Sequence, residues 1–107
     1  MNATAGSLIY ITDPKDGKKR PHMCICVFTN NAGIKYDWLV VPITSTTTIG
    51  ANNLVKVEHP KLKIPSYAKI NNVRTVTTED SFDVSTILFD EVFLKEVTTK
   101  LQFVLKG

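Results

Sequence analysis

The chain has 107 residues, of which 43% are hydrophobic and 21% are charged, and its formal net charge is +3. This length builds one domain around one core, and the composition excludes a disordered or fibrous protein. No apolar stretch approaches membrane-spanning length, and residues 1–7 lack the charged start and apolar segment of a signal peptide. We therefore expect one cytoplasmic domain over residues 1–107.

The positive charge is concentrated in the first three quarters of the chain. Residues 1–78 hold ten Lys/Arg and four Asp/Glu, whereas residues 79–107 hold three and six. A basic surface suits a polyanion or an acidic partner. Charge alone nevertheless favours the alternative, an ordinary solvated surface.

Short β-branched and aromatic runs predict a series of strands. In chain order we expect strands at Leu8–Thr12, His22–Phe28, Trp38–Ile43, Leu54–Val57, Ser66–Ile70 and Val73–Val76. Residues 13–17 form a turn, residues 18–20 continue that loop, and Asn71-Asn72 forms a kink or turn. The run His22–Phe28 is largely apolar on both faces, which indicates a central strand.

The C-terminal stretch changes from strand to helical periodicity. Phe89, Phe93, Val97 and Leu101 recur at helical spacing. Asp90 and Glu91 lie in the expected first turn, where the helix dipole favours carboxylates. We expect one amphipathic helix over residues 89–105, packed on a compact barrel-like sheet. The fold class is therefore mainly β with a C-terminal α-helix.

The string His22-x-Cys24-x-Cys26 looks like a cluster of metal ligands. Successive same-face positions of a strand lie roughly 6.5–7 Å apart, so three in a row do not converge on one ion. The same geometry disfavours a disulfide between the cysteines. We expect two reduced thiols, no metal and no cofactor.

Polar side chains end two strands that should be neighbours. Arg20 precedes the strand His22–Phe28, and Thr44 and Ser45 follow the strand Trp38–Ile43. A guanidinium fork and a hydroxyl on one rim can grip a phosphate and stabilise the charge of phosphoryl transfer. Lys69, Asn71 and Arg74 join this rim set. Spacing alone favours the alternative, a solvated arginine and a hydroxyl at a strand end.

The order of these segments resembles the MazF/PemK (Kid) toxin family over nearly the whole chain. The strings that carry the likeness are Gly6–Tyr10, Lys18–Pro21, Val41–Ser45, Ser66–Ile70, Val73–Val76 and the closing helix. The resemblance implies an SH3-like β-barrel of the MazF/CcdB type, usually a homodimer. It also implies the toxin of a type II toxin–antitoxin pair, whose antitoxin carries an acidic or amphipathic C-terminal segment.

The resemblance implies a metal-free endoribonuclease that cleaves single-stranded mRNA at short sequences. The RNA 2′-hydroxyl is the internal nucleophile, and the products carry a cyclic phosphate and a 5′-hydroxyl. By position, Arg20 matches the family's arginine before proline, and Thr44 matches its Pro-x-Thr threonine. Both would stabilise the pentacovalent phosphorus, with Arg20 also named as a proton donor. The expected RNA-binding residues are Lys18, Lys19, Ser45, Lys69, Asn71 and Arg74, and Lys15 and Lys56 would help to steer the backbone.

The chain departs from Kid-type members in one strand, where an arginine and an aspartate are replaced by Lys69 and Asn71. Lys69 keeps the charge without the fork, and Asn71 cannot act as a carboxylate base. His22, two residues after Arg20, is a candidate for the missing base because its titration range suits proton transfer at neutral pH. The alternative is a structural histidine, since family members usually have an apolar residue there.

A different function on the same fold stays open. The chain could be a catalytically silent binding protein, such as a CcdB-like inhibitor of a gyrase or an inactive homologue of the nucleases. RNA cleavage that depends on Arg20 and Thr44 separates the two hypotheses.

Overall fold

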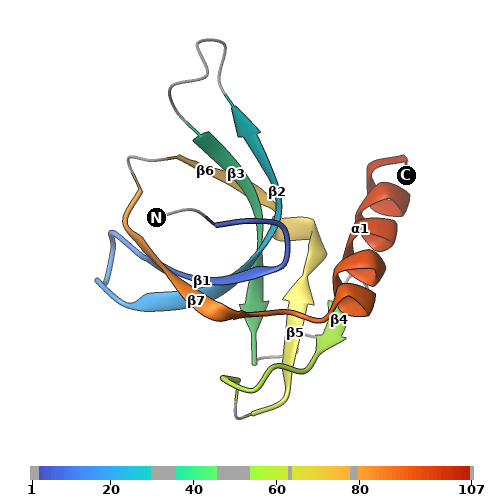
Figure 1. Ribbon diagram of the computed structural model, residues 1–107, viewed down its shortest axis with the longest axis horizontal. Coiled ribbons are helices and arrows are strands. Elements are labelled where there is room, and N and C mark those ends of the chain that lie inside the picture. The colour runs from blue at the N-terminus through green and yellow to red at the C-terminus, as the bar shows by residue number, and fades with distance from the viewer. Residues whose placement is uncertain (1–2, 30–35, 46–53, 63, 78–79, 107) are drawn as a thin grey trace.

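The computed structural model describes residues 3–29, 36–45, 54–62, 64–77 and 80–106 (Figure 1). The strands are β1 (Ser7–Thr12), β2 (Lys19–Thr29), β3 (Tyr36–Thr44), β4 (Leu54–Val57), β5 (Ser66–Lys69), β6 (Arg74–Thr77) and β7 (Phe82–Leu88). A single 3₁₀ turn, η1 (Ile70–Asn72), separates β5 from β6, and the chain closes with α1 (Glu91–Lys106). The predicted class, mainly β with a C-terminal helix, is confirmed.

The strands form one antiparallel sheet in the order β4-β5-β3-β2-β1-β7. β6 pairs with the first half of β3, beside the two residues of β3 that pair with β5. The sheet bends around itself, and α1 stands along one side of it (Figure 1). Within the described residues the pairing does not close, because β4 and β7 remain the two ends of the strand order.

β2 is the central strand that the sequence predicts, flanked by β1 and β3. Met23 and Ile25 enter the core that packs under α1, together with Leu8 and Val41. Cys24, on the opposite face, enters a second core that contains Ile9, Ile11, Trp38, Val40 and Val76. Alternation along one strand therefore supplies both cores.

Two parts of the sheet differ from the sequence prediction. The sequence prediction omits β7, in which Phe82 and Val84 alternate with Asp83 and Ser85. The alternation is short and the last three residues of the strand are exposed, so pairing with β1 holds β7 in place. β2 begins at Lys19, so Arg20 lies in a strand and not in the preceding loop. The reason is that β1 extends far enough to pair Ile11 with Arg20. Pro21 is tolerated because β2 pairs only with β1 there, the pairing with β3 starting at His22.

The chain switches from sheet to helix at residues 89–90. The Phe89 N–H donates to the Gly6 carbonyl oxygen (2.8 Å), which ties the segment to the start of β1. Asp90 then caps the helix, since its Oδ1 accepts from the Val92 N–H (2.8 Å). The helix therefore starts at Glu91, two residues later than predicted, and Phe93 and Val97 are its buried anchors. Neither helical segment of the described chain is long and apolar enough to cross a bilayer.

Both cysteines are free thiols. Burial raises the pKa of Cys24 to about 12, and burial also raises the pKa of Cys26. Among the described residues, no three His, Cys, Asp or Glu side chains are placed to share a metal ion.

Candidate active site

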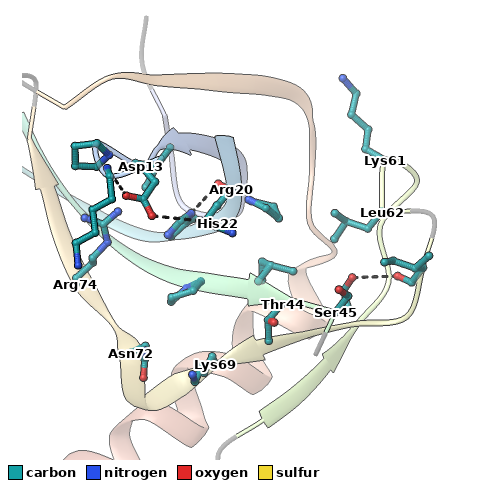
Figure 2. A pocket seen from close by; sticks show the side chains of 18 residues that line it. Asp13, Arg20, His22, Thr44, Ser45, Lys61, Leu62, Lys69, Asn72 and Arg74 are labelled. Carbon is teal, nitrogen blue, oxygen red and sulfur yellow. Dashed lines mark hydrogen bonds and ion pairs between the residues drawn. The ribbon is translucent and has the colours of Figure 1, made fainter. Parts of the chain in front are cut away.

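A cavity of about 1000 Å³ lies where the ends of β2, β3, β5 and β6 meet two loops (Figure 2). Seven of the residues predicted from sequence line it: Lys15, Arg20, His22, Thr44, Ser45, Lys69 and Arg74. The predicted rim set is thus largely brought together around one cavity.

The strand register explains why Arg20 and Thr44 share a wall. His22 of β2 pairs with Pro42 of β3 in antiparallel register. The pairing of β2 with β3 ends at this pair, and Arg20 and Thr44 each lie two residues beyond it on their own strands. Alternate strand residues share a face, so Arg20, His22, Pro42 and Thr44 all point to one side of the sheet.

Three of the predicted RNA-binding residues do not line the cavity: Lys18, Lys19 and Asn71. Lys56, which was expected to help steer the backbone, does not line it either. Lys19 lies on the other face of β2, where its ammonium group forms an ion pair with Asp83 of β7. Asn72 lines the cavity in place of Asn71. The two asparagines belong to η1, in which adjacent side chains point about 120° apart.

Loops add lining residues that the sequence analysis did not assign to the site. Asp13 comes from the β1–β2 loop, and Lys61 and Leu62 come from the segment before β5. No local signal marks them, because only the tertiary fold brings these loops to the end of β3. The described lining residues include five cations (Lys15, Arg20, Lys61, Lys69 and Arg74) and one carboxylate, that of Asp13. The cavity is therefore strongly basic.

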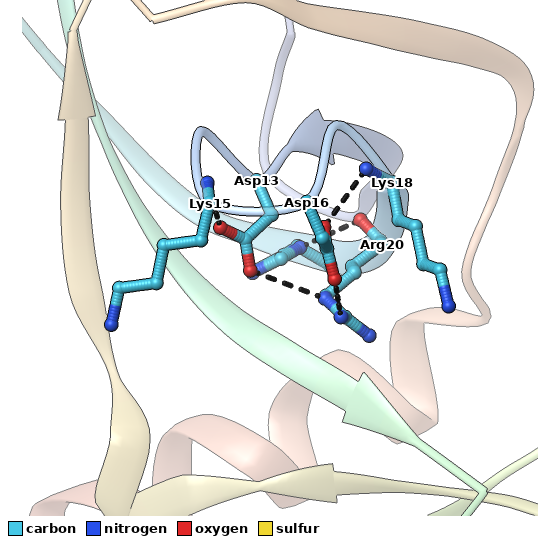
Figure 3. Close-up of polar contacts among 6 residues, drawn as sticks. Asp13, Lys15, Asp16, Lys18 and Arg20 are labelled. Atoms are coloured by element: carbon cyan, nitrogen blue, oxygen red, sulfur yellow. Dashed lines mark hydrogen bonds and ion pairs between the residues drawn. The ribbon is translucent and has the colours of Figure 1, made fainter.

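The Arg20 guanidinium is held by two carboxylates of the β1–β2 loop (Figure 3). Its Nη2 lies 2.6 Å from Asp16 Oδ2, and its Nε lies 3.4 Å from Asp13 Oδ2. The Lys15 N–H, which donates to Asp13, and then the Arg20 guanidinium lower the pKa of the Asp13 carboxyl. The Arg20 side chain is still 52% exposed, so an incoming phosphate can reach it.

We expect Asp16→Asn to strengthen binding of a non-cleavable single-stranded RNA about two- to fivefold at low salt, because exposed ion pairs of this kind are worth ~0–1 kcal/mol. The substitution removes the carboxylate that competes with phosphate for Arg20. Fluorescence anisotropy with 2′-O-methyl RNA measures the effect. Asp83→Asn is the matched control, since Asp83 pairs with Lys19 outside the cavity. Equal effects of both substitutions would contradict a specific competition at Arg20.

His22 is buried on the cavity wall, with 5% of its surface exposed. Its Nδ1–H donates to the Arg20 main-chain oxygen (2.9 Å). Burial lowers the pKa of His22, the hydrogen bond to Arg20 partly opposes this, and the nearby Arg74 cation lowers the pKa further. The imidazole is therefore neutral at pH 7.

This lowered pKa predicts a loss of stability on mild acidification. The folded-state pKa lies below the unfolded value of ~6.5, so between the two the unfolded chain binds more protons and stability falls as the pH drops. The difference in melting temperature between the natural protein and His22→Gln should therefore shift against the natural protein as the pH is lowered from 7.5 to 5. Thermal unfolding of both proteins across this range measures it. Parallel curves for the two proteins would contradict the assignment.

The sequence itself matches no protein-family model and no curated protein. Solved structures do match the fold. The crystal structure of MazE-MazF from Deinococcus radiodurans aligns with a TM-score of 0.75 and 19% identity, covering 98% of this chain and 96% of that chain. The chain has the MazF fold.

A second solved structure supports the same fold. It is an endoribonuclease in complex with its cognate antitoxin from a mycobacterial species, with a TM-score of 0.68, 19% identity and coverage of 98% of this chain and 96% of that one. In this chain's version of the MazF fold, the Arg20 end of β2 and the Thr44 end of β3 meet at the basic cavity.

Proposed function

We propose that this protein is a toxin endoribonuclease that cleaves single-stranded RNA at short specific sequences without a metal ion. The observation that carries the proposal is the placement of Arg20 and Thr44 on one wall of a basic cavity in a MazF fold. The resemblance in sequence order assigns the same two residues to phosphate stabilisation, which supports the proposal independently of the cavity.

The charge of the cavity suits an RNA backbone. Five cations against one carboxylate favour a polyanion, and each phosphate contact releases condensed counterions. Among the lining cations, Lys15 and Lys61 belong to loops. Lys69 belongs to β5 and Arg74 to β6 (Figure 2). A single strand can therefore contact cations on more than one side of the cavity.

The chemistry requires no activated water. The 2′-hydroxyl attacks the adjacent phosphorus, and the 5′-oxygen leaves, which produces a cyclic phosphate and a 5′-hydroxyl. The Arg20 fork and the Thr44 hydroxyl would donate to the non-bridging oxygens, whose charge grows in the transition state. A guanidinium stays protonated at neutral pH, so Arg20 acts chiefly through charge and hydrogen bonding.

The test is cleavage of a mixed-sequence RNA pool by the purified protein in the presence of EDTA. We expect cleavage that survives chelation and that is lost in Arg20→Ala and Thr44→Ala proteins with unchanged circular dichroism. Intact RNA across the whole pool would overturn the nuclease and favour the binding protein on the same fold. Cleavage that survives in both variants would point to a contaminating ribonuclease.

We also propose a homodimer and a cognate antitoxin with an acidic or amphipathic C-terminal segment. Support comes from the basic cavity and from large apolar side chains that the described surface exposes: Ile87, Leu88, Val92, Phe103 and Leu105. Light scattering of the purified protein tests the dimer. Co-expression with the product of a neighbouring gene, followed by co-purification, tests the antitoxin.

A further inference from the structure

One ring nitrogen of His22, Nε2, has no hydrogen-bond partner among the described residues. Its Nδ1 lies 2.9 Å from the Arg20 carbonyl oxygen, which only accepts hydrogen bonds, so Nδ1 carries the proton. In a neutral imidazole, Nε2 then holds a lone pair. No group in the described part of the chain forms a hydrogen bond with Nε2. Among the same residues, every fully buried side-chain nitrogen or oxygen has a hydrogen-bond partner, so the unbonded Nε2 is not fully buried. Nε2 is therefore open to the cavity that His22 lines.

The second histidine of the chain has no such free nitrogen. His59 Nδ1 accepts from the Lys61 N–H (3.0 Å), so its Nε2–H donates to the Ile87 carbonyl oxygen (3.1 Å). Its ring packs against Phe89, with ring centroids 4.8 Å apart. Both nitrogens of His59 therefore serve the backbone, whereas His22 has one nitrogen fixed by the backbone and one left to bind.

The surroundings keep His22 in the state that accepts a proton. Burial and Arg74 disfavour the imidazolium and hold its pKa below the usual range. The charged groups that line the same cavity are Asp13, Lys15, Arg20, Lys61, Lys69 and Arg74. The single carboxylate among them, Asp13, is already engaged by the Lys15 N–H and by Arg20. Asp13 is therefore a poorer acceptor than the unbonded Nε2.

We infer that His22 is the general base of this site, and that its Nε2 takes the proton from the 2′-hydroxyl of an RNA nucleotide bound across Arg20 and Thr44. This inference rests on the proposed function. The 2′-oxygen–phosphorus bond forms as the phosphorus–O5′ bond breaks. Water in the cavity protonates the leaving 5′-oxygen, and the imidazolium returns its proton to the resulting hydroxide. The hydrogen bond to Arg20 holds the base beside the residue that contacts the phosphate.

The ring state of His22 can be measured in the natural protein without any variant. Nitrogen-15 NMR of labelled histidine should assign the Nδ1–H tautomer to His22 and a titration midpoint below ~6.5. The Nε2–H tautomer, or an imidazolium at pH 7, would overturn the inference whether or not RNA is cleaved.

Kinetics then tests the role itself. We expect His22→Gln to lower the single-turnover cleavage rate ~10²–10⁴-fold, with binding of 2′-O-methyl RNA changed by less than ~3-fold. The rate of the natural protein should rise with pH up to the His22 midpoint found by NMR, and His22→Gln should lose that inflection. His59→Gln, assayed where circular dichroism shows it folded, is the matched control and should keep rate and inflection.

A modified substrate separates a base from an acid. A bridging 5′-phosphorothiolate has a leaving group that needs no proton, so it would rescue the loss of an acid but not the loss of a base. Rescue of His22→Gln by this substrate, or an unchanged rate across pH, would overturn the inference while leaving the nuclease standing. If the natural protein cleaved no RNA at all, the proposed function itself would be overturned.

Discussion

Arg20→Ala is expected to slow RNA cleavage by at least ~10³-fold, the scale on which an arginine stabilises a phosphoryl-transfer transition state. Its guanidinium is the forked cation that lines the cavity together with Thr44, and it is exposed enough to meet a phosphate. Arg20→Lys should recover only part of the rate, because an ammonium lacks the fork. Thr44→Ala should lower the cleavage rate ~10²-fold, the typical effect of removing one hydrogen-bond donor to a charge that develops in the transition state.

Single-turnover assays on a fluorescent RNA measure these effects with enzyme in excess. On α1, outside the cavity, Lys95→Ala removes a cation and Thr99→Ala removes a hydroxyl, and both variants should retain full activity. Circular dichroism and thermal melts establish that every variant is folded. A folded Arg20→Ala protein that cleaves at the rate of Lys95→Ala would show that phosphate stabilisation lies elsewhere.

Phe93→Ala is expected to lower the free energy of unfolding by ~3–5 kcal/mol, the range for truncating a buried phenylalanine. The side chain is 7% exposed and its ring centroid lies 5.4 Å from that of Phe89, in the core that joins α1 to the sheet. For a domain of this size the loss is a large part of the total stability. Urea denaturation followed by the fluorescence of Trp38, which lies in the second core, measures it.

Phe103→Ala is the matched control on the same helix. Phe103 is 75% exposed, so its truncation should change the free energy of unfolding by no more than ~0.5 kcal/mol in the monomer. Similar losses for the two variants, measured where light scattering shows a monomer, would contradict the docking of α1 through its Phe93 face. In a dimer, Phe103 is among the exposed side chains proposed to support the interface.

The sequence predicts the fold well where periodicity is strong. The helical spacing of Phe89, Phe93 and Val97 locates α1, although the capping role of Asp90 moves its start to Glu91. Apolar residues on both faces locate β2 at the centre of the sheet. In β7 the apolar/polar alternation covers only residues 82–85, and the position of the strand depends on pairing with β1, which local residues do not encode.

The candidate site also has some features that the sequence predicts and others that depend on the tertiary fold. Arg20 and Thr44 end adjacent strands, so their meeting follows from strand order and from the two-residue alternation of a strand. The carboxylates that hold Arg20, and Lys61 on the opposite loop, depend on loop conformation and could not be predicted. The orientation of the His22 ring depends on one hydrogen bond to a main-chain oxygen, which residue identity does not reveal.

The proposed function requires that the basic cavity let the RNA cleave itself through its own 2′-hydroxyl. The most direct measurement uses one RNA substrate with a single 2′-deoxy nucleotide at the cleaved position, incubated with the natural protein in EDTA. We expect the all-ribose substrate to give a cyclic phosphate and a 5′-hydroxyl by mass spectrometry, and the single 2′-deoxy substitution to prevent cleavage at that position. Cleavage of the 2′-deoxy substrate at the same bond, or products with a 5′-phosphate, would contradict it.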